Sequence, residues 1–361
     1  MTDIRYGIIG SGMMGQEHIR NIRLIDGARV TAVCDPDDEM RNQSEALAGH
    51  GCEVFTTHEA LMAAGLCDAL VIAVPNHLHH QVLVDVLPAN LPILVEKPLC
   101  TKLPDCEDVL AMAEQRTAPV WVAMEYRYMP PVERLLHATS AGETGAVRMI
   151  SIREHRFPFL KKVGNWNRFN QNTGGTLVEK CCHFFDLMRL IAKAEPVRVY
   201  ASGAADVNFR DEHHDGRTPD VLDNGFVIVD FDNGVRGMLE LCMFAEGSQW
   251  QEAISVIGDN AKAEALVPGP ARFSPDGAER ASEFVLSPRA SKTEQRETIE
   301  VDHTILAAGD HHGSTFFQHQ KFFAMVRDGG VPEVTLKDGL KSVRIGLAAE
   351  HSAKTGEAVV F

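Results

Sequence analysis

The 361-residue chain is 45% hydrophobic and 24% charged, a composition typical of a folded globular protein and unlike that of disordered or collagen-like chains. Its formal net charge of −15 disfavours nucleic acid as a partner, because binding to nucleic acid phosphates requires a basic surface. No apolar run approaches the roughly 18 residues of a membrane span, and the chain length favours two domains.

The N-terminus leads from Met1 directly into an apolar segment, without the pattern of a secretion signal. The eight cysteines are scattered, mostly within apolar runs, and lack the density of a disulfide scaffold. We therefore expect a soluble, cytoplasmic protein that does not bind membranes.

The first third of the chain alternates short apolar runs with amphipathic stretches, which is the rhythm of βαβ units. Several runs lack polar alternation, as expected for parallel strands that are covered on both faces. The predicted strands are residues 6–9, 30–34, 69–74, 93–95 and 120–123. Residues 1–123 are therefore predicted to form an α/β domain, a Rossmann fold with a doubly wound parallel sheet.

After residue 124 the strand candidates become longer and alternate polar with apolar residues, and turn signals join several of them. This pattern predicts that residues 124–361 form an α+β domain with a large, mainly antiparallel, open-faced sheet. The predicted strands are 148–155, 198–204, 226–231, 237–242, 253–257, 262–266 and 297–301, and the predicted helices are 131–139, 175–192, 314–327 and 337–354. Residues 268–292, rich in Pro, Ser, Ala and charge, are predicted to be an exposed loop.

A G-x-G-x-x-G motif lies between the first predicted strand and a helical stretch, at residues 10–15. In such a motif Gly10 allows a tight turn, Gly12 lets the backbone approach a pyrophosphate, and Gly15 permits close packing of helix on strand. The helix N-terminus then faces the negative charge of the ligand. The motif alone is weak, but its position in a βαβ unit predicts a dinucleotide-binding loop.

Asp35 ends the second predicted strand about 20 residues after the glycine motif, at the distance expected for an acid that binds the adenosine ribose. A carboxylate there accepts hydrogen bonds from both ribose hydroxyls and repels a 2′-phosphate. NAD is therefore predicted in preference to NADP, although Arg41 lies near enough in sequence to keep NADP as an alternative.

Three further segments carry chemistry. Pro75-Asn76-His77-Leu78-His79 has the pattern P-N-x-x-H, Glu96-Lys97-Pro98 reads E-K-P, and Gly174-Gly175 precedes Glu179 and His183. The chain ends with a helical stretch at residues 339–359 that contains Ala-Ala-Glu-His-Ser. Together these segments resemble the Gfo/Idh/MocA oxidoreductases, the glucose-fructose oxidoreductase and inositol dehydrogenase family, over nearly the whole chain.

The resemblance implies that Lys97, Glu179 and His183 form the catalytic set. On a helix, Glu179 and His183 would share a face, and a His is suited to take a proton from a substrate hydroxyl. The Lys97 ammonium can stabilise negative charge on the reacting oxygen. Taken alone, however, a His in an amphipathic helix is more often a packed residue, and a lone Lys a surface charge.

Many members of that family have Asp where this chain has Glu179, and the extra methylene could move the carboxylate onto a different substrate hydroxyl or into a role that orients His183. The resemblance also makes a cis Lys97-Pro98 bond plausible. The predicted cofactor-binding residues are Gly10, Gly12, Met13, Met14, Gly15, Asp35, Pro75, Asn76, His79, Glu96 and Lys97. The predicted substrate-binding residues are Lys97, Tyr126, Arg127, Trp166, Glu179 and His183, since polar groups beside aromatic planes suit a sugar.

No metal site is predicted. Potential ligands cluster at Cys181-Cys182-His183, at His77, His79 and His80, at His213-His214 and at His311-His312, but none has the C-x-x-C spacing of a metal site. We interpret His311 and His312 as ordinary loop residues.

The predicted function is NAD-dependent hydride transfer between nicotinamide and a secondary alcohol or ketone of a sugar, polyol or cyclitol, in other words a dehydrogenase acting on CH-OH groups. The resemblance leaves two alternatives. One is an enzyme that keeps NAD bound and uses transient oxidation to cleave a glycoside or epimerise a sugar, and the other is a non-catalytic regulator that senses NAD. The resemblance also implies a homodimer or homotetramer, formed by pairing of the open sheet faces.

Overall fold

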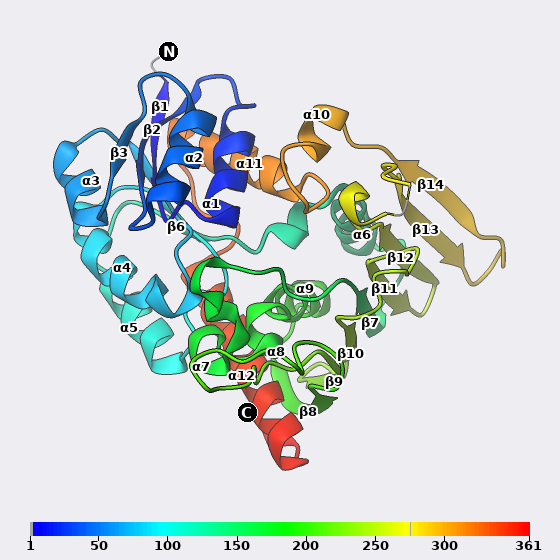
Figure 1. The fold of residues 1–361 in the computed structure, drawn as a ribbon. Coiled ribbons are helices and arrows are strands. Elements are labelled where there is room, and N and C mark those ends of the chain that lie inside the picture. The colour runs from blue at the N-terminus through cyan, green and yellow to red at the C-terminus, as the bar shows by residue number, and fades with distance from the viewer. Residues whose placement is uncertain (1–2, 275) are drawn as a thin grey trace.

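The computed structural model describes residues 3–274 and 276–361. It contains one parallel sheet of six strands and one mixed sheet of nine strands, which lie in opposite halves of the molecule (Figure 1). Within those two ranges, no helix combines the length and the apolar content needed to cross a membrane.

The first sheet has the strand order β3-β2-β1-β4-β5-β6, and all neighbouring strands are parallel. Its strands are β1 (Ile4–Ile9), β2 (Ala28–Cys34), β3 (Glu53–Phe55), β4 (Ala69–Ile72), β5 (Ile93–Val95) and β6 (Val120–Val122). The strand order reverses between β1 and β4, and ligands of doubly wound sheets bind at such a point, at the carboxyl ends of the strands. The predicted Rossmann sheet is therefore confirmed.

Helices connect these strands and cover the sheet on both faces (Figure 1). They are α1 (Met13–Ile22), α2 (Asp38–Ala48), α3 (His58–Ala64), η1 (Asn76–Leu78), α4 (His79–Val86), η2 (Leu87–Ala89) and α5 (Leu103–Ala113). Because both faces are covered, the central strands β1, β4 and β5 are almost entirely apolar and buried.

The second sheet has the order β14-β13-β12-β11-β7-β10-β9-β8-β15, and only the β7–β10 pair is parallel. Its strands are β7 (Val147–His155), β8 (Pro196–Ala204), β9 (Asn224–Phe231), β10 (Arg236–Cys242), β11 (Glu252–Gly258), β12 (Ala261–Val267), β13 (Ser282–Pro288), β14 (Gln295–Ile299) and β15 (Val359–Val360). The predicted mainly antiparallel sheet is confirmed.

Helices pack on one face of the second sheet, chiefly α6, α9 and α12. The helices after β6 are η3 (Glu125–Tyr128), α6 (Pro130–Ser140), η4 (Val163–Arg168), α7 (Asn170–Thr173), α8 (Thr176–Glu179), α9 (Cys182–Ala192), η5 (Ala271–Phe273), α10 (His303–Leu306), α11 (Ser314–Asp328) and α12 (Leu336–Thr355). The other face is open and carries exposed apolar side chains, among them Met149, Tyr200 and Phe226.

Helix α11 lies far along the chain but packs against the first sheet (Figure 1). Phe322 and Phe323 belong to the hydrophobic core that surrounds β1, and the Phe322 ring lies 6.1 Å from the ring of Tyr6. Val343 of α12 belongs to the same core, whereas Ile345 of α12 belongs to the core of the second sheet. The last sixty residues therefore contribute to both halves of the molecule.

Two local predictions were wrong. Residues 268–292 are not a continuous loop, because β13 pairs with β12 and β14 in the second sheet; Pro275 lies outside the described residues. The predicted helix at 175–192 is two helices, α8 and α9, with a break at Lys180 and Cys181. This break lies at the candidate active site.

Candidate active site

The glycine loop between β1 and α1 has the geometry that the motif predicts. Gly10 has a φ of +85°, and a Cβ on it would lie 2.6 Å from the backbone nitrogen of Val74. A Cβ on Gly15 would lie 2.2 Å from the carbonyl oxygen of Gly10. By contrast, a Cβ on Gly12 would meet nothing within 4 Å, so the backbone there is open to a ligand.

Asp35 follows β2 and is held by the backbone. Its Oδ2 accepts a hydrogen bond from the backbone N–H of Ser11 at 2.8 Å, and its Oδ1 accepts one from that of Asp37 at 2.9 Å. Each carboxylate oxygen keeps a further lone pair for a ligand hydroxyl. The Arg41 guanidinium donates to the carbonyl oxygen of Asp35 and to the carboxylate of Asp38, so it is already engaged by protein acceptors.

This region fits a dinucleotide. No side chain caps the N-terminus of α1, so the first N–H groups of the helix, at Met13 and Met14, can bind an anion. Pro75 and Asn76 follow β4, and Asn76 is buried with an Nδ2 that has no hydrogen-bond partner among the described residues. The Ser11 hydroxyl is unpartnered in the same way. Buried donors rarely stay unpaired, so a bound group is expected here.

His79 holds the framework of this region. Its side chain is fully buried, with Nδ1 2.8 Å from the carbonyl oxygen of Pro98 and Nε2 3.0 Å from that of Val74. The burial that surrounds His79 lowers its pKa, so the neutral ring has one N–H and donates to only one of these two carbonyl oxygens. His79 lies between the loop after β4 and the loop after β5 and helps to position them.

The Glu96-Lys97-Pro98 segment follows β5, and its Lys97-Pro98 bond is cis. Glu96 is buried, and its Oε1 lies 2.9 Å from Nε2 of His18 on α1. The other ring nitrogen of His18 lies 2.8 Å from Nε2 of His319 on α11. Glu96 thus anchors the backbone of Lys97 through a chain of buried side chains, instead of facing open space.

Lys97 lies at the break between α8 and α9. Its Nζ donates a 3.0 Å hydrogen bond to the carbonyl oxygen of Glu179, an acceptor that His183 N–H would use in a continuous α-helix. Burial alone would lower the pKa of Lys97, but the nearby Cys182, Glu96 and Glu179 together raise it. Lys97 is therefore a half-buried cation that joins the loop after β5 to the segment before α9.

His183, on the first turn of α9, is buried, and its Nδ1 has no hydrogen-bond partner among the described residues. Burial, followed by the positive charges of Lys97 and Lys180, lowers its pKa well below the ordinary value. The imidazole is therefore neutral at pH 7 and can accept a proton. The Lys97 ammonium is bonded to the carbonyl oxygen of Glu179, one turn before this imidazole in the chain.

Glu179, at the end of α8, has an Oε2 without a hydrogen-bond partner among the described residues, and burial raises its pKa although Lys162 and Lys97 act in the opposite direction. Nζ of Lys162 lies 3.9 Å from Oε1 of Glu179 and 4.7 Å from the centre of the Trp166 ring. Trp166 also lies 6.1 Å from His77, ring centre to ring centre. Lys162 thus connects two predicted site residues, although no sequence motif pointed to it.

Two predicted substrate-binding residues are engaged by the protein itself. Arg127 is buried and makes a bidentate ion pair with Asp186, at 2.5 and 2.6 Å, while its third guanidinium nitrogen donates to the carbonyl oxygen of Glu333. Tyr126 is 1% exposed, and its ring stacks on the imidazole of His183. Each guanidinium nitrogen of Arg127 therefore already has a protein acceptor, and Tyr126 contacts the candidate base directly.

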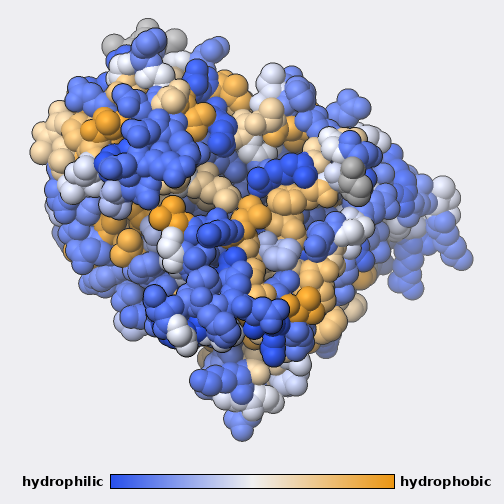
Figure 2. Space-filling model, viewed as in Figure 1, coloured by the Kyte–Doolittle hydropathy of each residue, from blue (hydrophilic) through white to orange (hydrophobic). Residues whose placement is uncertain are grey.

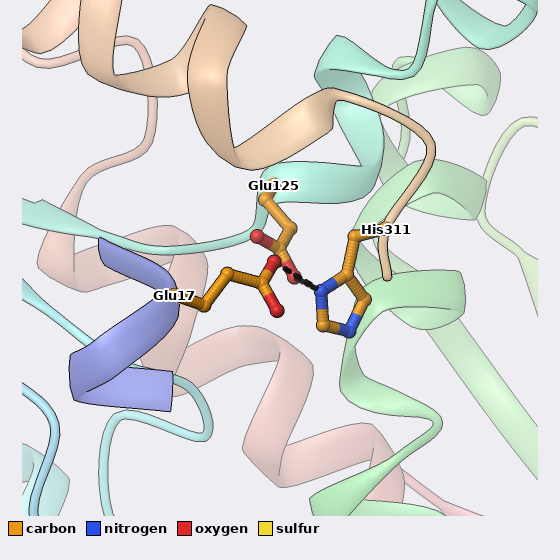
Figure 3. Close-up of side chains that lie close together, drawn as sticks. All are labelled: Glu17, Glu125 and His311. Atoms are coloured by element: carbon orange, nitrogen blue, oxygen red, sulfur yellow. Dashed lines mark hydrogen bonds and ion pairs between the residues drawn. The ribbon is translucent and has the colours of Figure 1, made fainter. Parts of the chain in front are cut away.

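A polar cluster that sequence reasoning missed lies beside Tyr126. Figure 3 shows Glu17 from α1, Glu125 from η3 and His311 from the loop before α11 pointing toward one another. Nδ1 of His311 lies 2.8 Å from Oε1 of Glu17 and 3.6 Å from Oε1 of Glu125, and the His311 ring lies 6.2 Å from that of Tyr126. We interpreted His311 as an ordinary loop residue, but the structure makes it part of this cluster.

The number of available protons limits the hydrogen bonds in this cluster. The Thr315 hydroxyl lies 2.8 Å from a carboxylate oxygen of Glu17 and 2.7 Å from one of Glu125, yet it has only one proton to donate. Burial raises the pKa of Glu125, and the nearby Glu96 and Glu17 add to this effect against the charge of His311. The hydroxyl proton can therefore serve only one of the two carboxylates at a time, while Nδ1 of His311 lies against both of them.

This cluster makes stability depend on pH. The Glu125 and Glu17 carboxylates outweigh burial and raise the pKa of His311 to about 9. In the unfolded chain the pKa is about 6.5, so the stabilisation is complete below pH 6.5 and is lost as the pH rises through 9. We expect His311→Gln to lower the free energy of unfolding by about 1–3 kcal/mol more at pH 6.5 than at pH 9.5, measured by urea denaturation. An equal loss at both pH values would contradict the ion pair.

The cluster lies beside a hollow between α1 and the segments 268–272 and 306–312 (Figure 2). Met13, Glu17 and Arg20 line one side of this hollow, and Arg272 and Asp310 line the other. Met13 is also the first residue of α1, so the hollow opens beside the glycine loop.

The first half of the site has an open glycine loop, an uncapped helix and an acid after β2. With the half-buried Lys97 and the neutral His183, these features define an oxidoreductase fold that binds a dinucleotide. Family profiles agree with this class. The profile described as "Oxidoreductase family, NAD-binding Rossmann fold" matches residues 4–124, and "Oxidoreductase family, C-terminal alpha/beta domain" matches residues 139–361. The chain belongs to the Gfo/Idh/MocA oxidoreductase family, as the sequence motifs predicted.

Known proteins resemble the chain at two levels. An inositol 2-dehydrogenase of Corynebacterium glutamicum is 32% identical over 237 residues, which cover 64% of this chain and 65% of that protein. The chain thus matches about two thirds of the length of this relative. An oxidoreductase domain protein from Kribbella flavida has the same fold, with a TM-score of 0.83, 20% identity and coverage of 100% and 99% of the two chains. A levoglucosan dehydrogenase, in complex with NADH and levoglucosan, has a TM-score of 0.82, 17% identity and 99% coverage of each chain.

Proposed function

We propose that this protein is an NAD-dependent dehydrogenase that transfers a hydride between the cofactor and a secondary alcohol or ketone of a sugar, polyol or cyclitol. The observation that carries the proposal is the hydrogen bond from Nζ of Lys97 to the carbonyl oxygen of Glu179, one helical turn before the buried His183. A half-buried cation near a neutral imidazole suits the removal of a proton from a hydroxyl group.

The protonation states assign a role to each side chain. Bound NAD would supply the hydride acceptor. Lys97 would donate a hydrogen bond from Nζ to the reacting oxygen and stabilise its negative charge. His183 would accept the hydroxyl proton at its unpartnered Nδ1, and the unpartnered Oε2 of Glu179 would accept a hydrogen bond from a second hydroxyl. A substrate with neighbouring hydroxyl groups fits this set, and the names of the inositol and levoglucosan dehydrogenases support the same class.

The surroundings of Asp35 favour NAD over NADP. A 2′-phosphate on the adenosine ribose would meet the Asp35 carboxylate, whose position two backbone N–H groups fix. The guanidinium of Arg41 close by is engaged by Asp35 and Asp38, so it could bind a phosphate only after leaving these acceptors. The charge at this end of the site is therefore negative.

A screen of sugars, polyols and cyclitols, followed by NADH absorbance, tests the proposal. We expect stoichiometric NADH formation with at least one compound and NADH binding that is at least tenfold tighter than NADPH binding. Turnover of a glycoside or epimer without net NADH formation would instead indicate transient oxidation. NADH binding without turnover of any compound would indicate a non-catalytic NAD sensor.

We also infer that the protein is a homo-oligomer, with the open face of the second sheet at the interface. Phe226 and Tyr200 on that face are 58% and 44% exposed, an unusual placement for large apolar side chains on neighbouring strands. Light scattering in solution would measure the mass of the assembly.

A further inference from the structure

The ring of Tyr126 lies flat against the imidazole of His183. The two ring centres are 4.1 Å apart and the two planes differ by 9°. Both residues are buried, at 1% and 2% exposed, and the edge of Phe184 packs on Tyr126 at 5.7 Å. A phenol held against one face of an imidazole leaves only the ring edges, which carry the nitrogen atoms, for hydrogen bonding.

The hydroxyl group of Tyr126 is fixed at the opposite end of the ring. It donates a 3.2 Å hydrogen bond to Glu252 and accepts one from Nζ of Lys180. The same Nζ lies 2.9 Å from Oε1 of Glu154, and Glu154 and Glu252 are direct neighbours on β7 and β11. Two strands of the second sheet therefore hold the phenol in place through its hydroxyl.

We propose that Tyr126 is a positioning residue that fixes the plane of the His183 imidazole and excludes water from its covered face. This proposal rests on the proposed function, because it assumes that His183 is the base. Tyr126 would act through His183 in this arrangement. The Tyr126 ring fixes the direction in which the nitrogen atoms of His183 point. Lys180, Glu154 and Glu252 in turn fix the position of the Tyr126 ring.

The Tyr126 ring is also expected to affect the pKa of His183. The groups that act on it are Lys97 after β5, Lys180 before α9, His311 before α11 and Arg156 after β7, and all of them are cations or can become cations. The carboxylates of Glu252 and Glu154 lie instead beyond the Tyr126 hydroxyl. Without the Tyr126 ring, water could reach the imidazole and the pKa of His183 would rise toward its ordinary value of about 6.5.

Two variants separate the ring from its hydroxyl. Tyr126→Phe keeps the stacked ring, so we expect kcat to stay within about tenfold of the wild type. Tyr126→Leu removes the ring, so we expect kcat to fall by about 10²-fold, since misplacing a reacting group by about 1 Å has an effect of this size. The pKa on the acid side of the kcat/KM profile should rise in Tyr126→Leu and not in Tyr126→Phe.

Tyr128→Leu is the matched control. Tyr128 lies two residues further on in η3 and is buried, but its ring contacts Trp121 in the first core, 6.1 Å away, and not His183. We expect this variant to lose stability while it keeps the pH profile of the wild type. A loss of turnover in Tyr126→Leu that Tyr128→Leu reproduces would overturn the proposal.

NMR titration of the His183 ring tests the proposal without a substrate, with His183→Gln used to assign the signal. We expect the pKa to be higher in Tyr126→Leu than in the wild type and unchanged in Tyr128→Leu. An unchanged pKa and unchanged kcat in folded Tyr126→Leu would overturn the positioning role, and so would an equal loss in Tyr126→Phe. A wild-type protein that oxidises no polyol would reject the proposed function, and the NMR result would still report on the stacking.

Discussion

Replacement of His183 by asparagine is expected to lower kcat by about 10²- to 10⁴-fold, the range that general-base catalysis contributes. Asparagine is similar in size to histidine and can still hydrogen-bond, but it cannot accept a proton at neutral pH. The neutral state of the buried His183 imidazole makes it the group with that capacity next to Lys97. Steady-state kinetics on the best compound of the polyol screen would measure the loss.

NADH binding provides the control for this variant. His183 lies in the second half of the chain, away from the glycine loop and Asp35, so the Kd for NADH should change by less than about threefold. Near-normal turnover in His183→Asn would contradict the assignment of His183 as the general base. Loss of NADH binding together with turnover would show that the substitution had disrupted the fold of the site.

The second large effect concerns stability. Arg127 and Asp186 form a bidentate ion pair, and their side chains are 9% and 0% exposed. Asp186→Ala would leave the guanidinium buried without its counter-charge, so we expect a loss of about 3–5 kcal/mol in the free energy of unfolding. Urea denaturation followed by circular dichroism would measure this loss.

A surface pair provides the matched control. Arg198 and Asp230 are also joined by an ion pair, but the Arg198 side chain is 60% exposed. Exposed pairs contribute about 0–1 kcal/mol, so Asp230→Ala should change stability little. The double variant Arg127→Met/Asp186→Leu should recover part of the loss, because it removes both buried charges. Equal effects of Asp186→Ala and Asp230→Ala would contradict the role of burial.

The first sheet was predictable from the sequence because its signals are local. Apolar runs form β1, β2, β4, β5 and β6, and the glycine loop has the turn and the close contacts that its motif requires at Gly10 and Gly15. The short strand β3 has only three residues and exposed side chains, so it lacks an apolar run. The alternating strands of the second sheet were predictable for the same local reason.

The break at Lys180 and Cys181 could not be predicted, because no local signal marks it and the Lys97 side chain that bonds to the Glu179 carbonyl there comes from another part of the chain. No Gly or Pro lies between Thr176 and Ala192 to signal an interruption. Strand β13 was missed because its flanking residues are rich in turn-forming residues, while its place in the sheet depends on β12 and β14.

The candidate site was predictable only where a motif marked it. Motifs marked Lys97, Glu179 and His183, whereas Lys162 and His311 belong to no motif and become neighbours of the site only through the fold. Arg127 and His79 were marked by their positions in motifs, but their hydrogen-bond partners could not be read from the chain.

Helix α12 constrains how the molecule can open. Its 20 residues span about 30 Å, and its first half is built into the core of the parallel sheet while its second half is built into that of the mixed sheet. A rigid-body rotation of one sheet away from the other would pull half of this helix out of its packing. Helix α12 therefore opposes such a rotation, and a chain cut after residue 123 would lose Phe322 and Val343 from the first core.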